Sequence, residues 1–177
     1  MFIESLQRET AVCPHSEVEQ FLADSPGRWH VISIREPDHP EAILKDALRS
    51  RVFVFTDVFG GTESDGPRAT HLESILRFAR QSGNAPLLVQ CWAGRSRSTA
   101  VALLLIVQSL WDKGMDGAEL VRTAVDALLM IRPVAAPNRL VLRLELEQFL
   151  PQSLAGTLAK SLLSEPRLME NFQTVSS

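Results

Sequence analysis

Short apolar runs alternate along this chain with longer segments in which apolar residues recur at helical spacing. Runs of the first kind are typical of buried strands, and segments of the second kind are typical of helices packed on a sheet. Strands are predicted at 2–3, 31–34, 51–55 and 86–89, and helices at 16–22, 41–48, 70–82, 98–110, 116–131 and 138–150. Because a helix follows each strand, we expect an α/β fold with a mainly parallel central sheet flanked by helices. In such folds the functional residues lie at the carboxyl ends of the strands.

Composition predicts a single domain. The 177 residues are 45% hydrophobic and 22% charged, which suffices for one sizeable core but not for two ordinary domains. After Pro151 the content of Ser, Thr, Glu and Gln rises and the helical stripe of leucines weakens. We therefore assign residues 1–150 to the folded domain and residues 151–177 to a helical or flexible C-terminal extension.

Charge and residue usage exclude several function classes. With a net charge of −3 and no basic run, the chain has no general attraction for nucleic acid. The longest apolar stretch, 99–107, is too short to span a bilayer. Two cysteines cannot form a disulfide framework and no segment resembles a secretory signal, so we expect a cytoplasmic protein. The four histidines lack metal-ligand spacing, so no metal or other cofactor is expected, and the oligomeric state is left open.

The candidate chemistry lies between the predicted strand 86–89 and the predicted helix 98–110. Residues 89–99 read Val-Gln-Cys-Trp-Ala-Gly-Arg-Ser-Arg-Ser-Thr. A loop that enters a helix N-terminus can turn successive backbone N–H groups inward, and the helix dipole adds to their attraction for an anion. The loop residues are therefore predicted to bind a phosphoryl group; they are Trp92, Ala93, Gly94, Arg95 and Ser96.

Three side chains around this loop suit phosphoryl transfer. Cys91 would lie near the helix dipole and a guanidinium, both of which favour the nucleophilic thiolate form. Arg97 offers a planar fork that can hold two phosphoryl oxygens at once, also while charge builds in the transition state. Ser98 can donate to the sulfur, which eases departure of the thiolate when a phosphocysteine intermediate is hydrolysed.

Cys91, five intervening residues and Arg97-Ser98 resemble the His-Cys-x5-Arg-Ser/Thr signature of the cysteine-dependent protein tyrosine and dual-specificity phosphatases. A looser similarity to small bacterial-type tyrosine phosphatase-like proteins extends from His30 to about Leu150. The resemblance implies hydrolysis of phosphomonoesters in proteins, at phosphotyrosine or phosphoserine/threonine, through a phosphocysteine intermediate. Asn138 resembles a family Asn that braces the phosphate loop, and it is equally well explained as a helix cap.

The chain departs from the family at Gln90, where the signature has His. In the family that His braces the loop and helps to set the ionisation of the thiol. Gln keeps a side-chain donor but cannot carry a positive charge, so we expect a braced loop and weakened chemistry. If the thiol stays protonated, the protein is instead a non-catalytic phosphate-binding pseudophosphatase.

Asp57 is the predicted general acid. It follows the predicted strand 51–55 and precedes Gly60-Gly61, which can serve as the hinge of a closing loop. It lies 34 positions before Cys91, a separation similar to that between acid and nucleophile in the family. Asp65 is the rival, although its polar surroundings are more typical of a turn.

Two loop residues leave alternatives open. Arg95 resembles a basic residue found in relatives that prefer inositol phosphates or phosphoinositides, which makes such a phosphatase the second candidate; equally, Arg95 can point outward and pair with a surface carboxylate. Trp92 is predicted to pack under the loop as part of the core, with stacking on an aromatic substrate as the alternative. A sulfur-transfer enzyme of the rhodanese type is a third candidate, which the Arg97-Ser98 ending disfavours.

Overall fold

The computed structural model describes residues 1–58 and 65–173. In these residues one five-stranded sheet has the order β1-β2-β5-β3-β4. The strands are β1 (Phe2–Ile3), β2 (Arg8–Pro14), β3 (His30–Arg35), β4 (Arg49–Val54) and β5 (Leu87–Cys91). Only the short β1 is antiparallel to its neighbour, and the other pairs of neighbouring strands are parallel. The predicted α/β fold with a mainly parallel sheet is confirmed.

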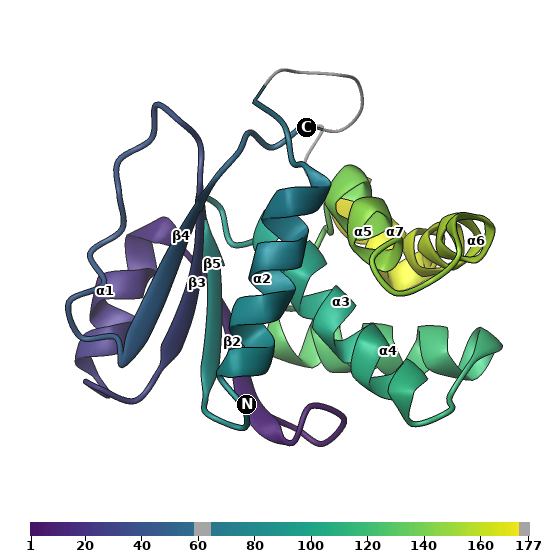
Figure 1. Cartoon of the computed structure of the whole chain (residues 1–177), viewed down its shortest axis with the longest axis horizontal. Coiled ribbons are helices and arrows are strands. Elements are labelled where there is room, and N and C mark those ends of the chain that lie inside the picture. Colours follow the sequence, from purple (N-terminus) through teal and green to yellow (C-terminus); the bar gives the residue numbers. More distant parts are fainter. Residues whose placement is uncertain (59–64, 174–177) are drawn as a thin grey trace.

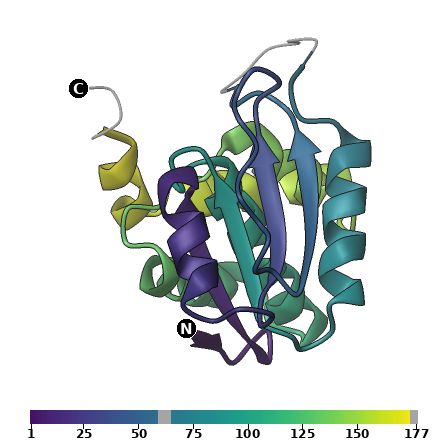
Figure 2. The same ribbon diagram turned by 90° about the vertical axis from the view of Figure 1, so that its left-hand side faces the viewer.

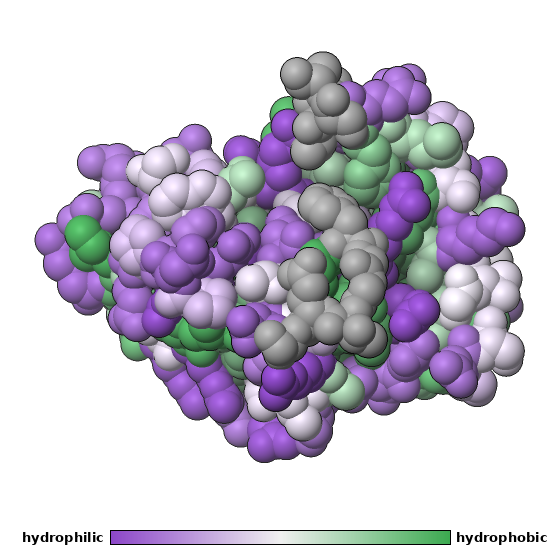
Figure 3. Space-filling model, turned by 90° about the horizontal axis from the view of Figure 1, so that it is seen from above, coloured by the Kyte–Doolittle hydropathy of each residue, from purple (hydrophilic) through white to green (hydrophobic). Residues whose placement is uncertain are grey.

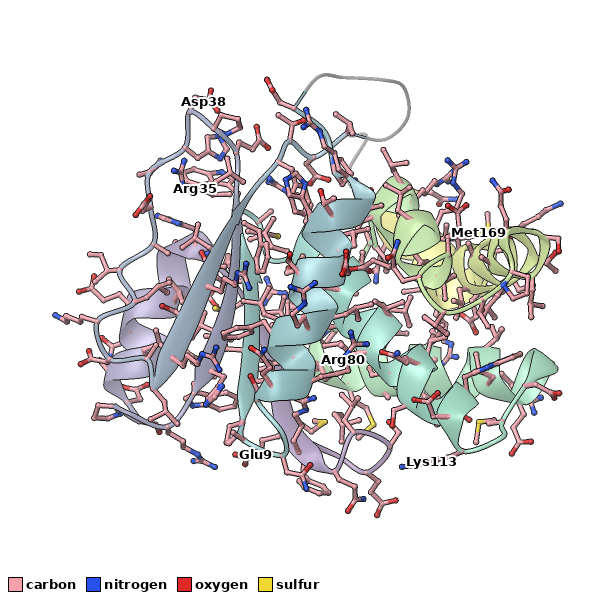
Figure 4. The ribbon with its side chains drawn as sticks, in the orientation of Figure 1. Glu9, Arg35, Asp38, Arg80, Lys113 and Met169 are labelled. Carbon is pink, nitrogen blue, oxygen red and sulfur yellow. The ribbon has the colours of Figure 1, made fainter. Side chains whose placement is uncertain are left out.

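Strand β5 is the buried centre of the sheet, with every residue shielded from solvent. It pairs with β2 on one side, where Pro14 lies opposite Cys91, and with β3 on the other, where Ser33 lies opposite Gln90. Figure 4 shows Arg35, the last residue of β3, at the upper end of the sheet, and Glu9, near the start of β2, at the opposite end. The carboxyl ends of the parallel strands therefore share the upper edge.

Helices cover both faces of the sheet (Figure 1). Helix α1 lies on one face and the other described helices lie on the opposite side. They are α1 (His15–Ala23), α2 (Ala69–Gln81), α3 (Arg97–Asp112), α4 (Gly117–Ile131), α5 (Arg139–Leu146), α6 (Gln152–Leu163) and α7 (Pro166–Gln173). The continuous apolar run from Thr99 to Val107 is explained by α3, which is buried throughout that stretch. Five of the six predicted helices are present, and α5 ends at Leu146, earlier than the predicted end at residue 150.

The predicted helix at 41–48 is wrong. This segment is an irregular connection between β3 and β4, and its backbone is bonded to another part of the chain: Gly27 N–H donates to Asp46 O at 2.8 Å, and Leu48 N–H donates to Trp29 O at 2.9 Å. The apolar residues that suggested a helix pack instead on the small core cluster around α1; they are Ala42, Leu44 and Ala47. The apolar spacing that suggested a helix therefore belongs to a loop that covers this cluster.

Residues beyond Pro151 contribute to the core. Helices α6 and α7 place Leu158, Leu162 and Leu168 in the main hydrophobic cluster, alongside residues of α3, α4 and α5. Burial of such side chains stabilises the docking of both helices by about 1.5 to 3 kcal/mol for each fully buried leucine. Among the described residues, no helix combines the length and apolar character needed to cross a membrane.

Candidate active site

The loop at 92–96 lies at the upper edge of the sheet, between the end of β5 at Cys91 and the start of α3 at Arg97. Gly94 makes its course possible, because its φ is +61° and a Cβ there would lie 2.6 Å from the backbone N of Pro14. Only glycine tolerates both the left-handed backbone and so close an approach to β2. Seen from above, the surface over this edge is mostly hydrophilic (Figure 3).

The carbonyl groups of the loop point away from the loop and accept hydrogen bonds from the surrounding protein. The carbonyl of Trp92 accepts from His15 N–H at 3.1 Å, that of Gly94 from Arg132 Nε at 3.0 Å, that of Arg95 from Ala136 N–H at 2.9 Å, and that of Ser96 from Asn138 N–H at 3.2 Å. By contrast, in the described part of the chain no backbone hydrogen bond is donated by Trp92, Ala93, Gly94 or Ser96. Peptide units fixed by their carbonyls leave N–H groups to bind an anion, as the sequence predicts for this loop.

Cys91 is buried, and its Sγ lies 3.0 Å from the hydroxyl oxygen of Ser98, the second residue of α3. This contact joins the two side chains that the sequence selects as nucleophile and sulfur partner. The sulfur therefore lies at the base of the loop, next to the first turn of a helix.

The guanidinium of Arg97 is only 2% exposed and is held by three groups. Nη1 donates to the carbonyl of Phe55 at 2.9 Å, Nη2 contacts Glu36 Oε1 at 3.1 Å, and Nε lies 3.6 Å from Asp57 Oδ2. An arginine has five N–H donors, so these partners fix its plane without using all of them. The carboxylates come from the segments that follow β3 and β4, which places acidic groups on the same edge of the sheet.

Asp57 lies against the loop at 92–96. Its Oδ1 accepts hydrogen bonds of 2.7 Å from both Ser96 Oγ and Asn138 Nδ2. The rival Asp65 is exposed, and among the described residues its one hydrogen bond is at its backbone carbonyl, which accepts Thr56 N–H at 2.8 Å. The structure thus brings Asp57, and not the Asp65 carboxylate, to the loop residues. The predicted hinge at Gly60-Gly61 lies outside the described residues.

Sequence reasoning missed Glu36 and the full role of Asn138. Glu36 directly follows β3, so its place at the carboxyl end of a strand was the available signal. Asn138 does cap α5, because its Oδ1 accepts Val141 N–H at 2.9 Å, and its Nδ2 also donates to Asp57 and to Val58 O. The two interpretations of Asn138, a helix cap and a brace near the loop, therefore hold together.

Gln90 braces the sheet next to Cys91. Its Nε2 donates a short hydrogen bond to Ser33 Oγ on the neighbouring strand β3. Its Oε1 is buried and has no hydrogen-bond partner among the described residues. The amide of Gln90 therefore makes only part of the hydrogen bonds that it could make.

The prediction that Trp92 packs under the loop is wrong. The side chain is 46% exposed, and its ring lies 5.0 Å from that of His15 and 4.3 Å from that of His39. The space beneath the loop is taken by the end of β2, against which Gly94 packs, so the large ring is directed outward.

The described contacts of Arg95 are those of an outward-pointing side chain, as one of its two interpretations predicts. The guanidinium donates to backbone carbonyls, from Nε to Val134 O at 3.2 Å and from Nη2 to Asn171 O at 3.1 Å. Both acceptors lie outside the loop, one before α5 and one in α7. The side chain is therefore directed toward the C-terminal helix.

Two further groups lie close to the loop. Cys13 is buried beside Gln90 in the sheet, and burial, more than the neighbouring Glu17, raises the pKa of its thiol to about 12, so it stays protonated. Ligand atoms of Glu36, Asp38 and His39 lie within 4.8 Å of one another, although the four histidines show no ligand spacing in the sequence. Because Glu36 is engaged by Arg97 and Asp38 is exposed, we assign no metal to this cluster.

No protein-family model and no curated protein match the chain in sequence. Solved structures match it in fold. The human tyrosine phosphatase-like serine/threonine/tyrosine-interacting protein is 21% identical with a TM-score of 0.54, over 77% of this chain and 88% of that one. The Yvh1 phosphatase domain from Chaetomium thermophilum is 20% identical with a TM-score of 0.53, over 77% and 86%. PTPMT1 in complex with PI(5)P is 16% identical with a TM-score of 0.52, over 86% and 93%.

These similarities extend over most of both chains, and they bear on the architecture. At 16 to 21% identity they show a shared fold. The resemblance predicted from the spacing of Cys91, Arg97 and Ser98 is thereby confirmed at the level of the fold. The chain has the fold of the cysteine-dependent tyrosine and dual-specificity phosphatases.

Proposed function

We propose that this protein is a cysteine-dependent phosphatase that hydrolyses phosphomonoesters through a phosphocysteine intermediate. The observation that carries the proposal is the position of Cys91 Sγ, 3.0 Å from Ser98 Oγ at the base of the loop, with Asp57 bonded to the loop through Ser96. A nucleophile, an anion-binding backbone and a carboxylate thus meet at one edge of the sheet. These are the parts that phosphoryl transfer to and from sulfur requires.

In the first step the Cys91 thiolate attacks phosphorus and the ester P–O bond breaks. Arg97 and the loop N–H groups hold the phosphoryl oxygens, and Asp57 gives its proton to the leaving oxygen, because an alkoxide or phenoxide is otherwise a poor leaving group. In the second step Asp57 takes a proton from water, which attacks phosphorus and breaks the S–P bond. Ser98 donates to the departing thiolate, and inorganic phosphate is released.

Phosphotyrosine or phosphoserine/threonine in proteins is the proposed substrate class. An inositol phosphate or phosphoinositide is the second candidate, supported by Arg95 and by the similarity to PTPMT1, whose structure contains PI(5)P. The contacts of Arg95 with Val134 O and Asn171 O favour the protein substrate, because they engage the guanidinium outside the loop. A cytoplasmic location accords with a reaction that needs a reduced thiol.

A pseudophosphatase that binds phosphate without turnover is the candidate from a different class. It is motivated by Gln90, which carries no positive charge, and one structural neighbour is itself described as phosphatase-like. The buried Oε1 of Gln90, which has no hydrogen-bond partner among the described residues, supports a weakened site. The two classes differ in a single measurable quantity, the release of phosphate.

Hydrolysis of an aryl phosphate by matched variants tests the proposal. Wild type should release phosphate, Cys91→Ser should not, and Asp57→Asn should be slowed by about 100-fold or more, as expected for loss of general acid catalysis. Asp65→Asn is the matched control and should retain the wild-type rate. If wild type releases no phosphate while Cys91→Ser still binds a phosphopeptide, the protein is a pseudophosphatase.

Substrate class is tested by comparing phosphopeptides with inositol phosphates in wild type and Arg95→Ala. We expect kcat/KM to be higher for phosphopeptides than for inositol phosphates. Arg95→Ala should leave this ranking of the two substrate classes unchanged. A preference for inositol phosphates that disappears in Arg95→Ala would establish the second candidate.

A further inference from the structure

Helix α7 is bonded to the segment that precedes α5. The side chain of Asn171 donates from Nδ2 to the carbonyl of Pro133 at 2.8 Å and to that of Ala135 at 2.9 Å. The helix is itself held in place by Leu168, which is fully buried, and by an ion pair between Arg167 and Asp126 of α4. Figure 2 shows α7, in yellow, near the upper end of the sheet. Asn171 therefore fixes residues 133–135 from a docked helix.

The same segment is bonded to the phosphate loop. Arg95 donates from Nε to Val134 O at 3.2 Å and from Nη2 to the backbone carbonyl of Asn171 at 3.1 Å. In return, the carbonyl of Arg95 accepts Ala136 N–H at 2.9 Å. Loop, connecting segment and α7 are thus linked by one set of hydrogen bonds, in which Asn171 takes part with both its side chain and its backbone.

This set extends to the proposed acid. Two residues after Ala136, Asn138 N–H donates to the carbonyl of Ser96 at 3.2 Å, and Asn138 Nδ2 donates to Asp57. A shift of the connecting segment would therefore move the carbonyls of the loop and the carboxylate of Asp57 together. Since rotation of a peptide unit moves its carbonyl and its N–H as one, the same shift would turn N–H groups away from the phosphoryl oxygens.

We propose that Asn171 is a positioning residue for the phosphate loop, so that the C-terminal helix sets the geometry of the anion site. The inference rests on the proposed function for its kinetic consequence, but anion binding tests it independently of turnover. Asn171 acts through Arg95 and residues 133–136, and it is assigned no contact with substrate.

Three variants test this role. Asn171→Ala removes the side-chain hydrogen bonds to Pro133 O and Ala135 O, and the isosteric Asn171→Asp replaces the donor by a carboxylate that faces two carbonyls. Glu170→Ala, one residue earlier on the exposed side of α7, is the matched control. The measurements are tungstate affinity, kcat and KM for an aryl phosphate, amide exchange at Ala136 and Asn138, and Tm.

We expect Asn171→Ala and Asn171→Asp to weaken tungstate binding and lower kcat/KM by about tenfold, a typical cost of losing a partner that orients site groups. Amide exchange at Ala136 and Asn138 should accelerate in both variants, and Tm should stay close to that of Glu170→Ala. A general structural role would instead lower Tm and leave the tungstate affinity of the folded protein unchanged, which would overturn the proposal.

Other outcomes are equally decisive. If Asn171→Ala does not fold, Arg95→Lys breaks the same set of hydrogen bonds from the loop side, and unchanged exchange at Ala136 in that variant would overturn the inference. If wild type binds tungstate but has no turnover, the proposed function fails, while a tenfold loss of affinity in Asn171→Asp still supports the role of Asn171. Wild-type affinity in both Asn171 variants would exclude that role even in an active enzyme.

Discussion

Asn138 donates from Nδ2 to Oδ1 of Asp57 over 2.7 Å, while its own Oδ1 accepts Val141 N–H at 2.9 Å. One buried amide therefore starts helix α5 and orients the carboxylate that we propose as the general acid. A structural bond and a functional bond lie on opposite ends of one side chain, so substitutions can separate them.

Asn138→Ser should keep the helix cap and lose the bond to Asp57, whereas Asn138→Ala should lose both. We expect about tenfold lower kcat/KM in both variants, because Asp57 loses one of its two donors. An additional loss of about 1 kcal/mol in the free energy of unfolding is expected only in Asn138→Ala. Aryl phosphate kinetics and urea unfolding measure the two effects. Ser96→Ala, which removes the other donor to Asp57, should resemble Asn138→Ser; wild-type kinetics in both would refute the orienting role.

Gly94→Ala should disable the loop. A Cβ at Gly94 would lie 2.6 Å from Pro14 N and 2.7 Å from Cys13 C, and the φ of +61° adds strain of about 1 to 2 kcal/mol. We expect tungstate affinity and kcat/KM to fall by about 100-fold or more, since the loop must move by a large fraction of an ångström. Gly27→Ala is the control, because Gly27 has a φ of +71° and nothing within 4 Å of its Cβ position. Equal effects of both substitutions on anion binding would contradict the close-contact explanation.

Gln90→His should give a faster enzyme. Gln90 Nε2 donates to Ser33 Oγ, and a histidine ring nitrogen can make that bond and also carry a positive charge next to Cys91. We expect kcat/KM to rise and the acidic limb of its pH dependence to move to lower pH. Gln90→Leu, which loses the donor, should be slower than wild type. A Gln90→His profile that coincides with that of wild type would show that residue 90 does not limit the chemistry.

Glu145 should make the protein less stable as pH rises. It is fully buried in α5, neither carboxyl oxygen has a partner among the described residues, and burial raises the pKa of this carboxyl well above its ordinary value. Because the folded state holds this proton after the unfolded chain has lost it, the free energy of unfolding falls from about pH 4.5 up to the raised folded pKa. The slope reaches about 1.4 kcal/mol per pH unit.

Urea unfolding of wild type, Glu145→Gln and Glu145→Leu between pH 5 and pH 8 tests this prediction. Both substitutions should make the fall in the free energy of unfolding with pH less steep, by up to the contribution of one titrating proton. Glu145→Leu should also be more stable than wild type at pH 7.5, because no buried polar group remains. A slope equal to that of wild type in both variants would show that Glu145 is not the group responsible.

The residues of the proposed chemistry could be predicted from the sequence because they lie close together in the chain. Cys91, Arg97 and Ser98 lie within one strand–loop–helix unit, and the spacing of apolar residues fixes where the strand ends and the helix begins. The same local logic predicted the parallel sheet, and hence the edge at which Asp57 lies. It also predicted a helix at 41–48, wrongly, because apolar spacing does not reveal that a segment's hydrogen-bond partners lie elsewhere in the chain.

Tertiary structure alone decided which distant groups complete the site and which way its side chains face. Glu36 holds Arg97, Asn171 of α7 meets the loop through Arg95, and Trp92 is exposed rather than buried. Each depends on contacts between segments that are far apart in sequence, where no short-range periodicity carries information. The sequence by itself determined the reactive groups and the unit that presents them, because both are local. Packing of the whole chain determined their orientation, because a side chain's direction is set by what surrounds it in space.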